Sequence, residues 1–156
     1  MGREGDRSGH TPKTRIVLAD DNEEILGEIQ KLLQPEFEIA GLVHEAASLV
    51  DAVFALKPDI VVSDLNMNGS SGIDMGHSII QRRLCDAVVI LTMYNEPGLI
   101  QRALRMGIRG YVLKVDAGDE LVAALDAVLA GKEYLSRGVV ASGRYRRAQD
   151  ESSPGG

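Results

Sequence analysis

The sequence predicts an α/β domain built on a doubly wound, five-stranded parallel sheet with the strand order 2-1-3-4-5. Strand-like and helix-like segments alternate from residue 15 to residue 130, with short connections between them. The strand-like runs are apolar and β-branched, as in strands that are buried on both faces. Acids stand where two of these runs end, Asp20 and Asp21 after the first and Asp64 after the third. Ligands of open α/β sheets bind at this edge, so the acids mark a candidate site.

The first β–α unit carries sequence signals for its strand and for both ends of its helix. A strand is predicted at 15–19, and it is followed by Asn22, a residue type that commonly caps a helix. Glu23 and Glu24 are favourable in the first turn because they face the positive end of the helix dipole. Pro35 stops the helix. The inward face of this helix consists of apolar residues at helical spacing: Ile25, Leu26, Ile29, Leu32 and Leu33.

The second unit and the third strand follow the same pattern. Residues 37–43 form the second predicted strand. The apolar positions from 47 to 56 form a helix that stops before Pro58. Residues 60–63 are the third strand. A loop rich in Gly, Asn and Ser is expected from 66 to 72, at the same edge of the sheet as the acids.

The remaining segments complete the sheet. A helix is predicted at about 73–83, and the strand at 87–91 leads to a helix that begins near Pro97. The strand at 110–113 precedes a last helix at 119–130, whose apolar residues again fall on one face. Parallel strands joined by helical crossovers follow from this order of elements.

The composition is that of an ordinary globular domain, because 44% of the 156 residues are hydrophobic and 26% are charged. Cys85 is the single cysteine, which excludes a disulfide framework and a cysteine-based zinc site. No run approaches the roughly 18 apolar residues of a membrane span. Residues 1–13 lack the apolar stretch of a secretory signal. We therefore expect a cytoplasmic protein without a membrane partner.

The formal net charge of −6 makes the chain a poor nonspecific ligand for nucleic acid, whose binding depends on basic contacts to phosphate. One domain is expected over residues 14–136. Residues 1–13 and 137–156 are rich in Gly, Ser and charge. We expect the first to be a disordered extension and the second a flexible linker or tail, with no output domain present.

The strand order brings the ends of the first, third, fourth and fifth strands together. The side chains that would meet in this cleft are Asp20, Asp21, Asp64, Thr92 and Lys114. Three carboxylates repel one another unless a cation offsets their charge, and an all-oxygen set of ligands suits Mg²⁺. Acids, a hydroxyl and an ammonium on successive strand ends indicate a small anionic group that is handled beside a metal.

Four motifs stand in order on the predicted strands: Leu18-Ala19-Asp20-Asp21-Asn22, Asp64-Leu65-Asn66-Met67, Ile90-Leu91-Thr92-Met93 and Gly110-Tyr111-Val112-Leu113-Lys114. With them, residues 14–135 resemble the receiver domain of bacterial two-component response regulators, which has a flavodoxin-like fold. The segment Gly131-Lys132-Glu133-Tyr134-Leu135-Ser136 is similar to the NarL/FixJ (LuxR-type) subfamily. Members of that subfamily regulate transcription.

The resemblance implies that Asp64 is phosphorylated, taking a phosphoryl group from a sensor histidine kinase as an aspartyl phosphate. Asp21 would bind Mg²⁺ directly and Asp20 through water. Asp64 and the backbone carbonyl of Asn66 would be further ligands. Lys114 would pair with Asp64 and later with an oxygen of the phosphoryl group.

The resemblance also implies a switch. Thr92 would donate its hydroxyl to the phosphoryl group, and Tyr111 would be the aromatic side chain that moves inward. The change would act on the surface of the fourth helix and fifth strand, and phosphorylation would favour a homodimer. DNA would be reached only through an output domain that is absent from this chain. We therefore expect a phosphoacceptor signalling domain rather than an enzyme, with self-phosphorylation and self-dephosphorylation as its only reactions.

Two positions depart from the family pattern, since Asn68 stands where proline is usual and Val115 stands where proline or aspartate is common. Asn68-Gly69 favours a tight turn instead. These departures keep open a phosphate-independent interaction module, or pseudo-receiver. A Mg²⁺-dependent phosphohydrolase of the haloacid-dehalogenase kind is a further alternative. Its second Asp would fall at Asn66, whose amide cannot act as a general acid or base.

Overall fold

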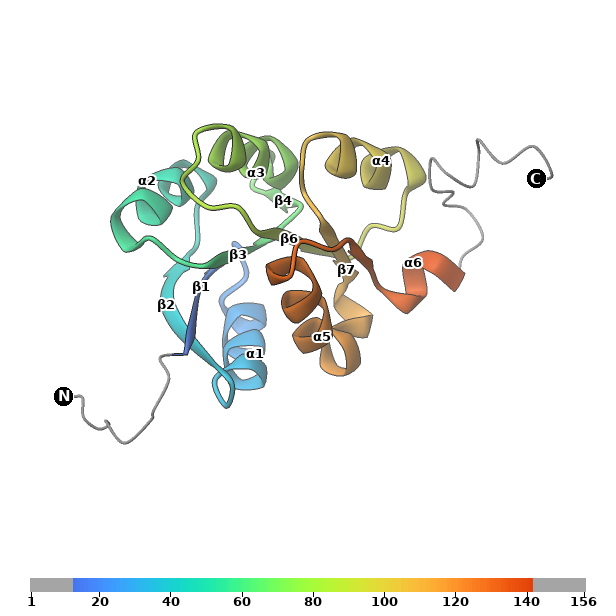
Figure 1. Ribbon diagram of the computed structural model, residues 1–156, viewed down its shortest axis with the longest axis horizontal. Coiled ribbons are helices and arrows are strands. Elements are labelled where there is room, and N and C mark those ends of the chain that lie inside the picture. The colour runs from blue at the N-terminus through green and yellow to red at the C-terminus, as the bar shows by residue number, and fades with distance from the viewer. Residues whose placement is uncertain (1–12, 142–156) are drawn as a thin grey trace.

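The computed structural model describes residues 13–141. Its main sheet has six parallel strands in the order β2-β1-β3-β6-β7-β8 (Figure 1). These strands are β1 (Thr14–Ala19), β2 (Phe37–Val43), β3 (Ile60–Asp64), β6 (Val88–Thr92), β7 (Gly110–Leu113) and β8 (Tyr134–Leu135). A separate hairpin consists of β4 (Asn66–Met67) and β5 (Ser70–Ser71). The helices are α1 (Glu23–Leu33), α2 (Ala46–Leu56), α3 (Gly72–Gln81), α4 (Pro97–Arg105), α5 (Ala117–Leu129) and α6 (Arg137–Ala141), and a 3-10 turn, η1, spans Lys114–Asp116.

The first five strands of the main sheet confirm the predicted doubly wound order. Helices α1 and α5 cover one face of the sheet, and α2, α3 and α4 cover the other (Figure 1). The predicted bounds of these elements agree with the structure to within two residues at either end. Within residues 13–141, none of the helices combines the length and the apolar character needed to cross a bilayer.

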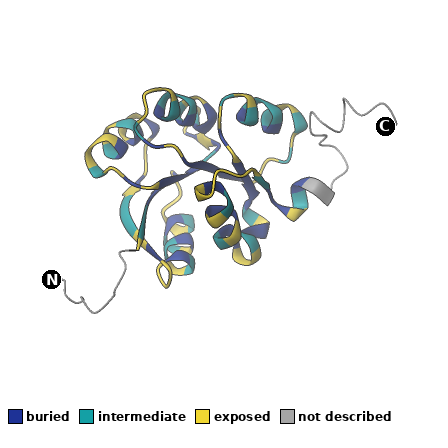
Figure 2. Cartoon of the chain, viewed as in Figure 1, coloured by how far each residue is buried: buried dark blue, intermediate teal, exposed yellow. Residues whose placement is uncertain are grey.

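The sheet divides the apolar core into two layers, because successive side chains of a strand point to opposite faces. In β3, Val61 packs in the layer with α2, α3 and α4, whereas Val62 packs in the layer with α1 and α5. The helices turn their buried sides toward the sheet (Figure 2). Burial on both faces explains why the strands are apolar at consecutive positions rather than at alternate ones.

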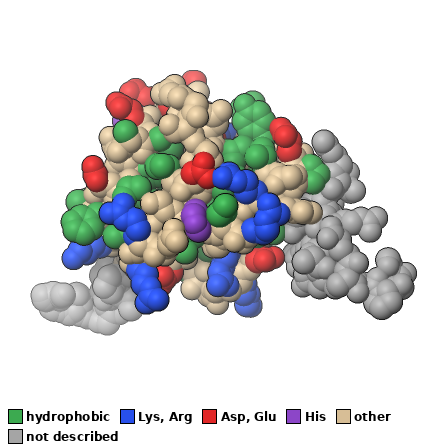
Figure 3. Space-filling model, turned by 90° about the horizontal axis from the view of Figure 1, so that it is seen from above, with side chains coloured by type: hydrophobic (Ala, Val, Ile, Leu, Met, Phe, Trp, Pro, Cys, Tyr) green, Lys and Arg blue, Asp and Glu red, His purple; other side chains and the backbone are tan. Residues whose placement is uncertain are grey.

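Helices α3 and α4 are joined at the surface of one layer. Arg102 of α4 forms an ion pair with Asp74 of α3. Nδ1 of His77 lies 3.2 Å from the carbonyl oxygen of Met106, which follows α4. Figure 3 shows the face formed by α2, α3 and α4, on which basic, acidic and apolar side chains are interspersed. The two contacts hold α3 and α4 together on this face.

The loop predicted at 66–72 contains the β4–β5 hairpin. Its two central residues are Asn68, with φ of 51°, and Gly69, with φ of 86°. Positive φ at both positions is the geometry of the type I′ turn, for which Asn-Gly is the favoured sequence. The predicted tight turn is thus confirmed. Met67 of β4 is almost fully buried and anchors the hairpin in the core.

Strand β8 and helix α6 are not predicted from the sequence. Strand β8 pairs with β7 through only two residues on each side, Gly110 with Tyr134 and Tyr111 with Leu135. A strand of this length is too short to show a periodic pattern. Helix α6 occupies residues that were expected to be a flexible tail, so the folded unit extends past the predicted boundary at residue 136. The rest of that tail and residues 1–12 lie outside the described residues.

A buried acid holds this last segment in place. Oδ2 of Asp116 accepts hydrogen bonds from the hydroxyl of Ser136 at 2.7 Å and from the backbone N–H of Gly138 at 2.8 Å. The Ser136 hydroxyl oxygen also accepts from the N–H of Leu113 at 3.0 Å. The side-chain amide of Asn95 donates to the carbonyl of Gly138 at 3.2 Å. These bonds fasten the segment after β8 to the start of α5 and to the loop after β6.

Candidate functional site

The three predicted acids meet at the carboxyl edge of the sheet. One carboxylate oxygen from each of Asp20, Asp21 and Asp64 lies within 4.8 Å of the others. Asp20 is buried, Asp64 is half-buried and Asp21 is exposed. They follow β1 or end β3, two strands that pair directly from Ile16 onward, which is why residues far apart in the chain become neighbours.

Lys114 is the base that balances these acids. Its ammonium lies 2.9 Å from Oδ2 of Asp20 and 3.6 Å from Oδ1 of Asp64. The family resemblance implied Asp64 as the partner of Lys114, whereas the structure makes Asp20 the nearer one. Oδ1 of Asp20 also accepts a hydrogen bond from the backbone N–H of Asn22 at 2.9 Å. Both oxygens of Asp20 are therefore engaged within the protein.

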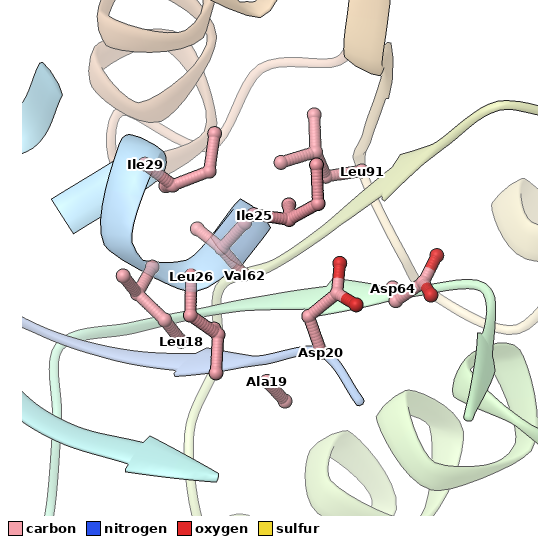
Figure 4. A pocket seen from close by; sticks show the side chains of 9 residues that line it. All are labelled: Leu18, Ala19, Asp20, Ile25, Leu26, Ile29, Val62, Asp64 and Leu91. Atoms are coloured by element: carbon pink, nitrogen blue, oxygen red, sulfur yellow. The ribbon is translucent and has the colours of Figure 1, made fainter. Parts of the chain in front are cut away.

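The surroundings of Asp64 disfavour its charge. Burial, and then the negative charge of Asp20, raise the pKa of the Asp64 carboxyl above 3.8, although Lys114 acts in the opposite direction. Figure 4 shows that Asp20 and Asp64 lie beside apolar side chains such as Ile25 and Leu91. The cavity that these residues enclose is about 10 Å³, close to the smallest volume that holds one water molecule. These apolar neighbours contribute to the burial of the Asp64 carboxyl.

Replacing Asp64 with asparagine is expected to raise the free energy of unfolding of the metal-free protein at neutral pH. Because folding raises the pKa of this carboxyl, the folded state binds its proton more tightly than the unfolded state does. The wild-type protein therefore loses stability as the pH rises from 3.8 through the raised pKa, and the variant avoids this loss. Urea unfolding with a chelator, at about pH 4 and pH 7, should show a larger advantage for the variant at pH 7. An advantage of equal size at both values would contradict the prediction.

Thr92 and Tyr111 lie behind the acids and hold one backbone segment. Both residues are fully buried. The Thr92 hydroxyl oxygen accepts a hydrogen bond from the backbone N–H of Tyr94 at 3.1 Å. The Tyr111 hydroxyl donates to the carbonyl oxygen of the same Tyr94 at 2.6 Å. Burial, and then the charge of Glu96, raise the pKa of Tyr111 well above its usual range, so this hydroxyl remains a donor.

An open cleft of about 410 Å³ lies over the acids. It is lined by Asp20, Asp21, Asn22, Asp64, Asn66, Asn68, Gly69, Met93, Tyr94 and Lys114. Thr92 and Tyr111 do not line it, whereas the other predicted site residues do. Among the lining residues that the sequence analysis did not assign to the site are Asn22 and Met93. Asn22 and Met93 directly follow predicted site residues, a signal that could have identified them.

Gly72 packs closely against the backbone of Asp64. Its N–H donates to the carbonyl of Leu65 at 2.6 Å, which brings the start of α3 against the end of β3. A Cβ at position 72 would lie 2.0 Å from the carbonyl oxygen of Asp64. The same carbonyl accepts a hydrogen bond from the Ser63 hydroxyl at 2.9 Å. Gly72 was not predicted as a site residue, because a glycine at the start of a helix carries no distinctive pattern of its own.

The fold and the site together define a class of protein: a doubly wound α/β domain that gathers three carboxylates and one lysine at the carboxyl edge of its sheet. Residues 16–126 match the family model described as the response regulator receiver domain. The chain belongs to this family.

Curated relatives agree with this assignment. The chain is 31% identical over 123 residues to the transcriptional regulatory protein DesR of Bacillus subtilis, a match that covers 78% of this chain and 61% of DesR. It is 28% identical over 150 residues to the nitrate/nitrite response regulator protein NarL of Escherichia coli, with 92% of this chain and 69% of NarL covered. The chain thus spans less than two thirds of the length of DesR. Its relatives are response regulators of the NarL/LuxR type.

Solved structures show the same fold. A LuxR-family two-component response regulator from Aurantimonas sp. superposes with a TM-score of 0.78 at 27% identity, covering 90% of this chain and 99% of that one. The isolated REC domain of RcsB from Salmonella enterica serovar Typhimurium, solved in the presence of the phosphomimetic BeF3-, gives a TM-score of 0.75 at 27% identity. That match covers 83% of this chain and 97% of the RcsB domain. The chain is therefore a receiver domain of a NarL/LuxR-type response regulator in a two-component system.

Proposed function

We propose that this receiver domain accepts a phosphoryl group on Asp64 from a sensor histidine kinase, in a reaction that depends on Mg²⁺. The observation that carries the proposal is the placement of Asp64 within 4.8 Å of two further carboxylates and 3.6 Å from the Lys114 ammonium. A carboxylate in these surroundings can act as a nucleophile only if the negative charge around it is compensated.

The donor set fits a hard divalent cation. Asp21, Asp64 and the backbone carbonyl of Asn66 would hold Mg²⁺ directly and Asp20 through water, since all four supply oxygen. The charge of Asp20, and to a smaller extent that of Asp21, raises the pKa of Asp64, so a cation there would relieve a repulsion that the fold builds in. When bound, Mg²⁺ supplies positive charge that neutralises the oxygens of the incoming phosphoryl group.

The chain's own groups orient the nucleophile. Oδ1 of Asp64 accepts a hydrogen bond from the N–H of Leu65 at 2.8 Å and lies nearest to Lys114. This leaves Oδ2 to form the new bond to phosphorus. The bond between phosphorus and the imidazole nitrogen of the kinase breaks, and its electron pair stays on that nitrogen. Lys114 stays beside the product and offsets the charge of the acyl phosphate.

The conformational change would be transmitted from the site to α4 through the backbone of Tyr94. Thr92 and Tyr111 both bond to this residue, and α4 begins at Pro97, three residues further along. If the Thr92 hydroxyl turns to an oxygen of the phosphoryl group, its bond to the Tyr94 N–H changes, and the start of α4 changes with it. This supports regulation through the α4 surface. We propose homodimerisation as the response by extension from the family resemblance.

The wider role follows from the relatives. DesR and NarL are named as regulators, and structures named for RcsB include dimers bound to DNA. We propose by extension that the signal controls transcription through an output domain, and that the phosphodonor is a kinase acting in the cytoplasm.

Phosphorylation of Asp64 can be tested directly by intact mass. Incubation with acetyl phosphate and Mg²⁺ is expected to add one phosphoryl group to the wild-type protein and none to the Asp64→Asn variant. A chelator should prevent the adduct. If neither acetyl phosphate nor candidate kinases modify the folded wild-type protein, the domain is a phosphate-independent interaction module.

A further inference from the structure

We propose that the Asn68–Gly69 turn is a positioning device for the metal site, in which the backbone N–H of Asn68 holds the carboxylate of Asp21. This inference rests on the proposed function, because it assigns Asp21 to the cation. It also gives a role to one of the two positions at which this sequence departs from its family.

The contact itself is direct. The N–H of Asn68 donates to Oδ2 of Asp21 at 3.1 Å. Asp21 is exposed, so this bond restrains a side chain that could otherwise move among several rotamers. One oxygen is held by a fixed backbone donor, which leaves the second oxygen of Asp21 for a cation. A hydrogen bond to a charged carboxylate is stronger than one between neutral groups.

The turn can act in this way because it is rigid at its base. Met67 has 1% of its surface exposed and pairs with Ser70 across the hairpin. At the tip, the N–H of Gly69 donates to Oδ1 of Asn66 at 2.9 Å, which closes the turn with a side chain. The donor at position 68 is therefore fixed relative to the core rather than carried on a loose loop.

The hydrogen bond from the Gly69 N–H to Asn66 also determines where the Asn66 side chain lies. Asn66 stands two residues after the proposed phosphoacceptor, and its carboxamide oxygen is engaged by the turn. Its backbone carbonyl is the fourth proposed metal ligand. One turn thus orients two of the groups that would surround the cation, Asp21 through a main-chain donor and Asn66 through its side chain.

Proline, the residue usual in the family, could not fill this role here. Asn68 has φ of 51°, whereas a proline ring fixes φ near −65°. Proline also lacks the N–H that Asp21 accepts. Asparagine adopts positive φ more readily than most residues, and glycine does so without strain. The position therefore offers a test variant that removes the donor and a control that keeps it.

The experiment is Mg²⁺ titration by calorimetry, with Asn68→Pro as the test and Asn68→Gly as the matched control. Removing a partner that orients a metal ligand typically weakens affinity by about 10- to 100-fold. We expect the proline variant to lose affinity in this range and the glycine variant to stay within about threefold of wild type. Circular dichroism confirms that each variant is folded. Wild-type affinity in a folded proline variant would overturn the inference and leave the proposed function intact.

Two further outcomes are decisive. If the wild-type protein binds no Mg²⁺, the proposed metal site and this inference fail together. If the proline variant does not fold, the Asp21→Ala variant provides the test. The quantity measured is the exchange rate of the backbone amide proton of Asn68. Its exchange with solvent, measured by NMR, should be several-fold faster than in the wild-type protein. Unchanged exchange would show that Asp21 does not hold this N–H, and would overturn the proposal.

Discussion

Replacing Gly72 with alanine is expected to destabilise the domain by about 3 kcal/mol, the upper part of the range for overpacked sites. The added methyl group would lie 2.0 Å from the carbonyl oxygen of Asp64 and 3.1 Å from its carbonyl carbon. Neither atom belongs to a flexible side chain, so the start of α3 or the end of β3 must move. Urea unfolding monitored by circular dichroism measures the loss.

The matched control is Gly118→Ala, because Gly118 also lies in the first turn of a helix. A Cβ there would meet nothing within 4 Å. This substitution should leave stability unchanged or raise it by up to about 1 kcal/mol, since alanine favours helix more than glycine does. Similar losses for both variants would show that the close approach of Gly72 to Asp64 is not the cause. A soluble Gly72→Ala protein should also be phosphorylated more slowly, because the nucleophile is displaced.

Removing the ammonium group of Lys114 is expected to cause the second large loss of stability. Lys114→Met is expected to destabilise the metal-free domain by about 3 kcal/mol at neutral pH, a typical loss when one partner of a buried ion pair is removed. The side chains of Asp20 and Lys114 are only 5% and 17% exposed. Without the ammonium, two inward acids would face each other with no compensating charge nearby among the described residues. Methionine keeps most of the volume of lysine, so the packing changes little.

Arg137→Met provides the comparison. Arg137 also pairs with two acids, Asp119 and Glu120, but its side chain is 69% exposed. Loss of an exposed pair typically changes stability by less than about 1 kcal/mol. Unfolding free energies of the two variants, measured with a chelator at pH 7, should therefore differ clearly. Equal effects would mean that burial does not strengthen the contact between Lys114 and Asp20. Added Mg²⁺ should restore part of the stability lost in Lys114→Met.

The sequence predicted the sheet well because each strand is buried on both faces. A run such as 60–63 is apolar at every position, which requires covering helices on both sides and a parallel sheet. Strand order then places Asp20 and Asp64 side by side without further information. For the same reason, the convergence of the site could be predicted from residues that are more than forty positions apart.

Other features depend on contacts that leave no local pattern. Strand β8 has two residues, and its position is set by Ser136 and the buried Asp116 rather than by periodicity. The nearer approach of Lys114 to Asp20 is a detail of side-chain placement, which sequence spacing does not encode. The support that Gly72 gives to Asp64 depends on a close backbone approach, since a Cβ at position 72 would lie 2.0 Å from the Asp64 carbonyl oxygen.

The network around Asp116 also determines where this domain can be cut. A chain shortened to the predicted boundary at residue 136 would lose Gly138, and with it one donor to Asp116 and the acceptor of the Asn95 amide. It would also lose Val139, which is fully buried in the core layer of α2, α3 and α4. We therefore expect the smallest autonomous unit to run at least to Val139. The contacts at this edge also hold the loop after Thr92, so we expect trimming the domain to disturb the proposed switch as well as the fold.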